Sequence, residues 1–175
     1  MVTPVYLKEE SLRSWLQKVC NKYGDFKVCG NYIDKFGEKR WTKHKSVMEC
    51  WSDDLKFLDT VSHRQVLPYE VILDLDDKES IAKKEDICDH LEELGEEFYC
   101  FSTGSKGYHI HIISKDICNL SDYHKKLLRE QIYALSDIAF DELKASSKVM
   151  IAISSVPHWK SGKEKVLVRK SKWVN

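Results

Sequence analysis

The sequence has little of what marks a membrane protein, a secreted protein or a chain of several domains. No apolar run approaches the length of a membrane span, and the N-terminal segment lacks the basic, apolar and small-residue sections of a signal peptide. The three prolines lie far apart, and there is no repeat, low-complexity tract or Pro/Gly/Ser-rich linker. We therefore expect a cytoplasmic protein (nucleoid-associated if prokaryotic) with no membrane contact and a single domain over residues 1–175.

The cysteines do not form a recognisable metal motif. Six cysteines are spread along the chain without a Cys-x-x-Cys pair. In an intracellular protein such cysteines are usually reduced and buried. Cys20, Cys29, His44 and Cys50 could be drawn as a zinc site, but their spacing matches no standard zinc knuckle. A structural zinc ion is therefore not expected.

The charges are segregated although the formal net charge is zero. Residues 74–97 carry eleven acidic side chains against three lysines, whereas residues 144–175 carry eight basic side chains and one acid, Glu164. Two solvated faces would explain this pattern. So would an acidic centre that binds cations beside a basic surface for polyphosphate or nucleic acid. The charge pattern alone does not distinguish the two.

The periodicity of apolar residues predicts an α+β fold. Helices are expected over 8–23, 80–95 and about 121–145, the second with Ser80 as its N-cap and Gly95 as its stop. Strands are expected at 69–76, 97–102, 108–114, 149–154 and 165–169. The order predicts a central, largely antiparallel or mixed sheet flanked by helices in a core over 67–175, after a helical or irregular part over 1–66. Within that part, residues 25–66 are aromatic and basic with weak periodicity.

Two carboxylates end the first expected strand, "YEVILDLD". Alternation along a strand points Asp74 and Asp76 to the same face, roughly 7 Å apart. Two like charges at this spacing are costly unless a cation lies between them, and hard divalent ions such as Mg²⁺ take carboxylate oxygens. The plainer interpretation is a strand that runs into a polar turn, with Asp77 and Lys78 in the turn.

A glycine turn and two histidines follow in "TGSKGYHIHI". Gly104 and Gly107 let the backbone approach phosphate oxygens closely, and Lys106 adds a mobile positive charge. His109 and His111 fall on one face of the following strand. An ordinary half-buried hairpin shows the same alternation, so the signal comes from the neighbouring carboxylate pair as much as from the turn itself.

Three stretches in this order resemble the archaeo-eukaryotic primase superfamily, which includes replicative primase small subunits and primase-polymerases. "VILDLDD" resembles its first motif, hydrophobic-Asp-hydrophobic-Asp. "STGSKGYHIHI" resembles its second, Ser-Gly-x-(Lys/Arg)-Gly-x-His, with Thr103 in place of the usual serine. "MIAISSVPHWKSGK" is similar to a later segment with Ser-x-His-x-Lys-Thr-Gly, although Ala152 stands where an arginine is usual. The resemblance covers roughly residues 68–170.

The resemblance implies a fold, a reaction and a set of site residues. The fold would be an RRM-like primase core, and the reaction a DNA-templated nucleotidyl transfer that starts or extends a strand from nucleoside triphosphates. Asp74 and Asp76 would be catalytic and would bind Mg²⁺ or Mn²⁺. The residues implied to bind the nucleotide are Thr103, Ser105, Lys106, Gly107, His109, His158 and Lys160. The implied partners are a DNA template, nucleoside triphosphates and a primase large subunit or helicase.

One departure from the family pattern bears on catalysis. The family supplies a third metal-binding carboxylate before the last histidine, where this chain has Ser146 or Ser147. Asp137, Asp141 or Glu164 would have to substitute for it. Without a substitute, metal affinity falls, because a serine hydroxyl does not compensate the charge of two divalent ions.

Two other functions remain open on the sequence. In a nicking nuclease, His109 and His111 would chelate a metal while Tyr123 or Tyr133 attacks DNA. In a non-catalytic relative, the domain would bind nucleic acid or nucleotide only. We expect His111 to be a supporting residue rather than a metal ligand. The region 25–66 is a candidate template-contacting surface, with a mixed polar loop as the alternative.

Overall fold

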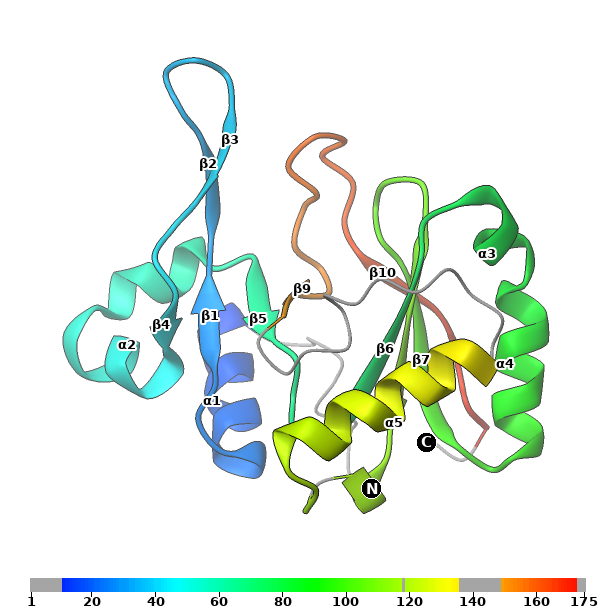
Figure 1. Ribbon diagram of the computed structural model, residues 1–175. Helices are drawn as coiled ribbons and strands as arrows, with labels where there is room; N and C mark the ends of the chain where they lie inside the picture. Colours follow the sequence, from blue (N-terminus) through cyan, green and yellow to red (C-terminus); the bar gives the residue numbers. More distant parts are fainter. Residues whose placement is uncertain (1–10, 118, 136–148, 173–175) are drawn as a thin grey trace.

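The computed structural model describes residues 11–117, 119–135 and 149–172, and in these ranges the chain has an α+β fold (Figure 1). The elements before residue 68 are α1 (Leu12–Tyr23), β1 (Lys27–Cys29), β2 (Asn31–Ile33), β3 (Lys39–Trp41), β4 (Lys45–Ser46), α2 (Val47–Asp53), the 3-10 helix η1 (Leu55–Thr60) and β5 (His63–Gln65). Those after it are β6 (Glu70–Leu75), α3 (Lys78–Ala82), α4 (Lys84–Glu93), β7 (Glu97–Ser102), β8 (Tyr108–Ile113), η2 (Lys115–Ile117), α5 (Asp122–Leu135), β9 (Met150–Ala152) and β10 (Val166–Lys170). No helix in the described ranges has the length and apolar character of a membrane span.

The second half is built on a four-stranded antiparallel sheet with the order β10–β7–β8–β6. The predicted hairpin is confirmed as β7 and β8, and β6 pairs with β8 so that Asp74 lies opposite His109. Because side chains alternate along a strand, Asp74, His109 and His111 share one face of this sheet. Ile110 and Ile112 point to the other face.

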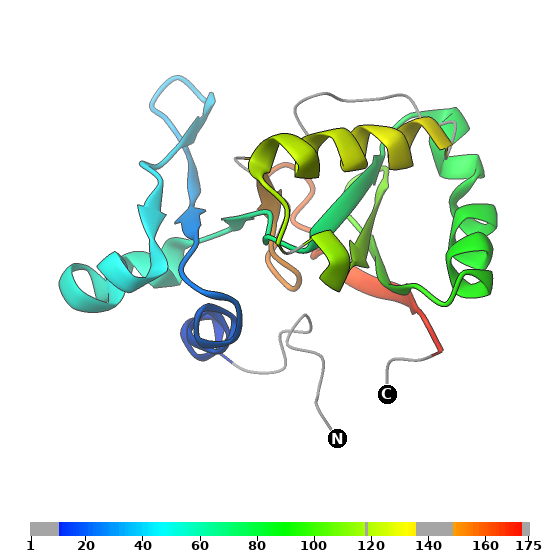
Figure 2. The same cartoon turned by 60° about the horizontal axis from the view of Figure 1, so that its bottom comes forward.

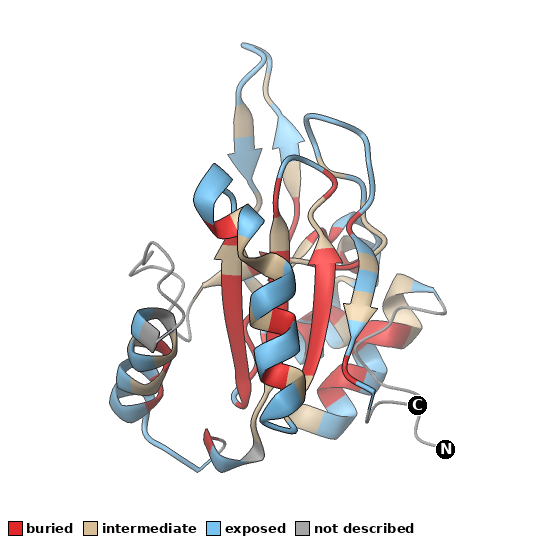
Figure 3. Cartoon of the chain, turned by 90° about the vertical axis from the view of Figure 1, so that its right-hand side faces the viewer, coloured by how far each residue is buried: buried red, intermediate tan, exposed pale blue. Residues whose placement is uncertain are grey.

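Helices α4 and α5 cover the apolar face of this sheet (Figures 2 and 3). Ile112 of β8, Leu91 of α4 and Leu128 of α5 line one apolar pocket. Arg129 of α5 is buried, and its guanidinium donates to the carbonyl oxygen of Glu70 at 3.0 Å. The sheet is therefore flanked by helices, as the sequence predicts.

The polar face of the same sheet turns towards the first half of the chain. There a second antiparallel sheet has the order β4–β1–β5–β9, and β9 comes from the far end of the sequence. Trp15 of α1 and Arg64 of β5 line a small pocket together with His111. One hydrophobic core joins both halves, since it contains Trp15 and Leu16 as well as Phe98. The polar face is consequently buried within the molecule.

The predicted helix over 80–95 differs from the structure at its start. Two short helices, α3 and α4, occupy this stretch, and Asp77 rather than Ser80 is the N-cap. The Asp77 carboxylate accepts the backbone N–H groups of Glu79 and Ser80, each at 2.9 Å. Ser80 lies inside the first turn and donates its hydroxyl to Asp77. A carboxylate is the better cap at this position because it also interacts with the positive end of the helix dipole.

Candidate functional site

The three stretches that resemble primase motifs meet at one edge of the second-half sheet. A Cβ on Gly107 would lie 2.3 Å from the carbonyl oxygen of Leu75 and 3.1 Å from Cα of Asp76. A Cβ on Gly104, where φ is 74°, would lie 2.3 Å from the carbonyl oxygen of Lys163. Side chains larger than hydrogen do not fit at either position. The two glycines therefore hold the turn over 103–107 between the end of β6 and the loop before β10.

The loop before β10 is held against the glycine turn by its own polar groups. Ser161 donates its hydroxyl to the carbonyl oxygen of Gly104. The backbone N–H of Ser161 donates to Nδ1 of His158 at 3.3 Å, and the backbone N–H of His158 donates to the carbonyl oxygen of Lys163 at 2.8 Å. Burial, with the charges of Lys39 and Lys160 added, lowers the pKa of His158. His158 is thus positioned beside the turn as a mostly neutral imidazole near pH 7.

The carboxylates and the exposed site residues lie along this edge. Asp74 is half-buried and its Oδ1 is 3.4 Å from Nε2 of His109, whereas Asp76 is exposed just beyond β6. Thr103 closes the turn by donating its hydroxyl to the carbonyl oxygen of Gly107 at 3.1 Å. Ser105 and Lys106 of the turn and Lys160 of the loop are exposed. The structure brings all the predicted site residues to one end of the sheet.

A buried lysine that the sequence did not single out connects the two histidines. Lys165 is 2% exposed, and its Nζ lies 3.1 Å from Nδ1 of His109, 2.9 Å from Nε2 of His111 and 2.9 Å from the carbonyl oxygen of Ala152. A lysine ammonium has three donors and no acceptor, so all three of its protons are used here. The two ring nitrogens must therefore accept. In consequence the proton of a neutral His109 is on Nε2, which faces Asp74.

A buried carboxylate holds the other end of this chain of contacts. Glu70 is fully buried, and Arg64 binds both of its oxygens at 2.7 Å. His111 Nδ1 lies 2.6 Å from Oε1 of Glu70, and the backbone N–H of Leu67 donates to Oε2 at 2.9 Å. All four lone-pair positions of the carboxylate are occupied, as a buried charge requires. We call the residues Arg64, Glu70, His111, Lys165 and His109 the buried polar chain.

The buried polar chain fixes the protonation of its members. Burial raises the pKa of Glu70, but the charge and hydrogen bonds of Arg64 outweigh this and hold the pKa well below its usual range. Burial, followed by the charge of Lys165, lowers the pKa of His111 well below its usual range. His111 is therefore neutral at pH 7, donating to Glu70 and accepting from Lys165.

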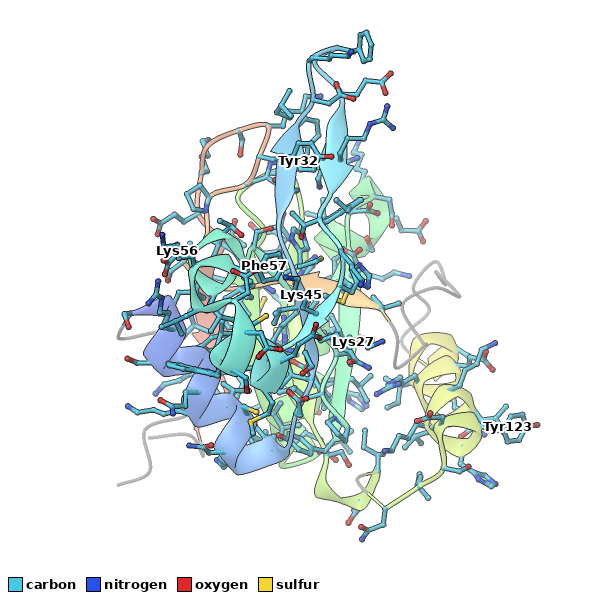
Figure 4. The ribbon with its side chains drawn as sticks, turned by 90° about the vertical axis from the view of Figure 1, so that its left-hand side faces the viewer. Lys27, Tyr32, Lys45, Lys56, Phe57 and Tyr123 are labelled. Carbon is cyan, nitrogen blue, oxygen red and sulfur yellow. The ribbon has the colours of Figure 1, made fainter. Side chains whose placement is uncertain are left out.

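The buried polar chain also bears on the nicking-nuclease hypothesis, in which His109 and His111 would together bind a metal. The ammonium of Lys165 occupies the position between the two imidazoles where a shared metal would lie. Tyr123 is exposed on α5 and points outward, away from the rest of the molecule (Figure 4). The side chain of Tyr133 lies outside the described residues. The geometry therefore gives no support to a metal held by His109 and His111.

The carboxylates fit a hard divalent ion bound together with phosphates. Mg²⁺ usually keeps several waters and is held by one or two carboxylates plus substrate phosphates. Asp74 and Asp76 are the residues that would have to supply these oxygens. Among the described residues, no group of three or more His, Cys, Asp or Glu side chains could hold a metal ion by itself. Of the candidates for a third acid, Glu164 lies exposed in the loop beside Gly104, and Ser146, Ser147, Asp137 and Asp141 lie outside the described residues.

The candidate zinc ligands are part of the first half of the molecule. Cys20, Cys29 and Cys50 are buried free thiols, whereas His44 is exposed.

Part of the basic C-terminal segment is neutralised by acidic residues of the same chain. Arg169 of β10 forms ion pairs with acidic residues of α4, at 2.9 Å to Glu85 and 2.6 Å to Asp89, so part of the segregated charge is paired internally.

Comparison with known proteins identifies a fold. No protein-family model matches the sequence, and no curated protein sequence matches it. Among solved structures, the crystal structure of primase RepB' matches with a TM-score of 0.53 and 14% sequence identity, over 93% of this chain and 57% of that one. At this identity the match shows the fold alone. The chain therefore has a primase-like fold, and it spans little more than half the length of the RepB' chain it matches.

The buried His111 predicts an acid-sensitive fold. Its pKa is depressed in the folded state, so only the unfolded chain takes up this proton as the pH falls below about 6.5. The stability contributed by neutral His111 is complete above that pH and is lost as the pH falls, by at most about 1.4 kcal/mol per pH unit. We expect His111→Gln, which retains a donor and an acceptor but binds no proton, to lower stability at pH 7.5 and to reduce its decline between pH 7 and pH 5.

Urea unfolding of the wild type and the variant at several pH values measures this decline. His44→Gln, at an exposed position, is the matched control and should follow the wild type. An equally steep decline in His111→Gln and the wild type would contradict the assignment.

Proposed function

We propose that the chain is a primase-type nucleotidyltransferase of the archaeo-eukaryotic primase superfamily, acting on nucleoside triphosphates at a nucleic-acid template. The observation that carries this proposal is the meeting of three segments at one sheet edge: Asp74 and Asp76, the turn 103–107, and the loop with His158. Gly104 and Gly107 make this contact possible through their close approach to the other two segments. The primase-like fold supports the same reaction class.

The reaction would join a 3′-hydroxyl to the α-phosphorus of a nucleoside triphosphate. The new bond is between the 3′-oxygen and that phosphorus, pyrophosphate leaves, and the hydroxyl proton passes to solvent. Asp74 and Asp76 would hold Mg²⁺ or Mn²⁺, which when bound neutralises charge on the phosphates. The chain's own residues then bind and orient the triphosphate, which is the larger part of the catalysis of phosphoryl transfer.

Each site residue has a role that follows from its position. Lys106 on the turn and Lys160 on the facing loop are exposed and supply mobile positive charges for the phosphate oxygens. His109 presents its Nε2 proton on the side of Asp74, where it would donate to a phosphate oxygen bound there. Lys165 keeps His109 in this tautomer, so we regard Lys165 as a positioning residue.

A primer-extension assay tests the proposal. The purified chain is incubated with Mn²⁺ or Mg²⁺, ribo- or deoxynucleoside triphosphates, and a single-stranded template with or without a primer. We expect metal-dependent products longer than the primer, or new short strands on the unprimed template. If no product forms under all of these conditions, the catalytic proposal is overturned.

Two other outcomes of the same assay separate the alternative functions. Template binding without any product would identify a non-catalytic nucleic-acid-binding protein, which the lack of a three-ligand group among the described residues would also fit. A covalent protein–DNA adduct that disappears in Tyr123→Phe would identify a nicking nuclease.

A further inference from the structure

The hairpin of β2 and β3 is an ordered arm that exposes aromatic side chains. It pairs with no other strand among the described residues and projects from the body at the top of Figure 1. At its base, Thr42 bonds to Gly30 through both backbone and hydroxyl, at 3.1 and 2.8 Å. At its tip, Asp34 accepts the N–H groups of Phe36 and Glu38 at 2.8 and 3.0 Å and pairs with Arg40. Within the region 25–66, β2 and β3 therefore form an ordered hairpin rather than an irregular loop.

The two faces of the hairpin differ in what lies beside them. Register places Tyr32 opposite Arg40 on one face, and Ile33 opposite Lys39 on the other, which also carries Trp41. Tyr32, Ile33 and Trp41 are each about half exposed, between 47% and 53%. Isolated two-stranded hairpins are only marginally stable in water. The hairpin exposes apolar side chains on both of its faces although this does not stabilise it. Exposed apolar surface of this kind is typical of a binding site.

The Lys39 face is directed towards the loop that carries the third motif. The ammonium of Lys39 lies 4.0 Å from the ring centroid of Trp41 and 5.2 Å from that of Trp159. Trp41 in turn meets the ring of His63 edge-on at 4.6 Å. Trp159 is 43% exposed and follows His158, which belongs to the candidate site. Two exposed indoles and a lysine from segments far apart in the sequence thus share one surface.

A small pocket lies where this surface meets the candidate site. Its lining includes Lys39 of the hairpin, His158 and Trp159 of the loop before β10, and Thr103 of the glycine turn. None of the described residues that line it is acidic. A nucleotide at this pocket would meet the ammonium of Lys39 and the indole of Trp159 and would lie beside the glycine turn.

We propose that Lys39, Trp41 and Trp159 form a stacking surface for a single-stranded nucleic acid, which runs past this pocket towards Thr103. Bases stack on exposed indoles whatever their sequence, and a lysine between the rings neutralises the phosphates. A duplex offers no free base faces to these rings, so single strands are favoured. This inference rests on the proposed function, since the bound strand would be the template or the growing end.

Binding of labelled oligonucleotides without nucleotides or metal tests the surface directly. Fluorescence anisotropy would follow an oligothymidylate, an oligouridylate and a DNA duplex, each about twelve nucleotides or base pairs long, within the range of single-strand sites. We expect Trp41→Ala and Trp159→Ala each to weaken single-strand binding on the order of tenfold. Lys39→Gln should weaken it and also reduce its dependence on salt. The comparison of the two oligomers shows whether DNA or RNA is preferred.

Tyr32→Ala is the matched control, because it removes an equally exposed aromatic ring from the opposite face of the same hairpin. It should bind as the wild type does, within about twofold. The proposal is overturned if Trp41→Ala binds like the wild type, if Tyr32→Ala loses as much affinity, or if the wild type binds neither oligomer. Circular dichroism confirms that each variant is folded.

The binding result and the extension assay fail independently. Hairpin-dependent binding in a protein that makes no product would leave the surface in place and overturn the catalytic proposal. Primer extension by a wild type whose binding does not depend on Trp41, Trp159 or Lys39 would keep the catalytic proposal and overturn this one.

Discussion

Replacing Asp74 with asparagine is expected to abolish nucleotide incorporation while the protein stays folded. The amide has almost the same size as the carboxylate but carries no charge, so it is a much weaker ligand for Mg²⁺ or Mn²⁺. A metal bound to the reacting phosphates contributes several kcal/mol to the stability of the transition state. Its loss corresponds to a decrease of about 10³-fold or more in the rate of incorporation.

Stability should change much less than activity in this variant. Asp74 is half-buried, and its Oδ1 lies 3.4 Å from Nε2 of His109, which is too long for a strong ion pair. The two measurements are primer extension and urea unfolding. Asp86→Asn on α4, an exposed carboxylate outside the candidate site, is the control and should retain wild-type activity. Incorporation near the wild-type rate by Asp74→Asn would remove Asp74 from the site and with it the proposed reaction.

Replacing Lys165 with methionine is expected to destabilise the protein strongly. Methionine has a similar length but no donors, so His109 Nδ1, His111 Nε2 and the carbonyl oxygen of Ala152 each lose a hydrogen bond in a buried place. Leaving a buried acceptor without its donor typically costs about 1–3 kcal/mol. With three such acceptors, we expect the free energy of unfolding in urea to fall by at least about 3 kcal/mol.

Lys163→Met is the matched control, because the same change is made two residues away at an exposed position. Its effect should stay within about 0.5 kcal/mol. If Lys165→Met proves as stable as Lys163→Met, Lys165 does not make the buried hydrogen bonds assigned to it.

A second measurement on the same position separates positioning from stability. Nitrogen NMR of the imidazoles in the wild type should show His109 protonated on Nε2 and His111 protonated on Nδ1. In Lys165→Arg, which keeps the charge, some of this tautomer preference and some activity should be retained. If the methionine variant does not fold, this arginine variant still tests the assignment, and wild-type imidazoles in the opposite tautomers would contradict it.

Much of the second half could be predicted from the sequence because its signals are local. The alternation in "YHIHII" and the turn that precedes it are enough to predict a hairpin, and the pairing of β7 with β8 confirms it. Alternation along "YEVILDLD" likewise predicts that Asp74 and Asp76 share a face. Short-range periodicity could not predict the first half, where strands of two or three residues are too short to show a period.

The environment of His111 could not be predicted, because a polar face of a strand usually indicates solvent. Here the face is covered by residues from the first half and by Lys165, 54 residues further along the chain. One local signal was present: Glu70 interrupts an apolar run, and a charge in such a run requires a buried partner. Its partner, Arg64, lies in a segment whose strand the sequence did not reveal.

The sequence by itself therefore determined the α+β class, the central hairpin and the residues that could carry phosphate chemistry. These depend on spacing of a few residues, which strand and turn geometry convert directly into position. Only the tertiary structure decided that Lys165 occupies the space between His109 and His111, and that Trp41 and Trp159 share a surface. Contacts of this kind depend on how distant segments pack together. The short-range pattern of residues along the chain does not report which distant side chains will be buried against each other.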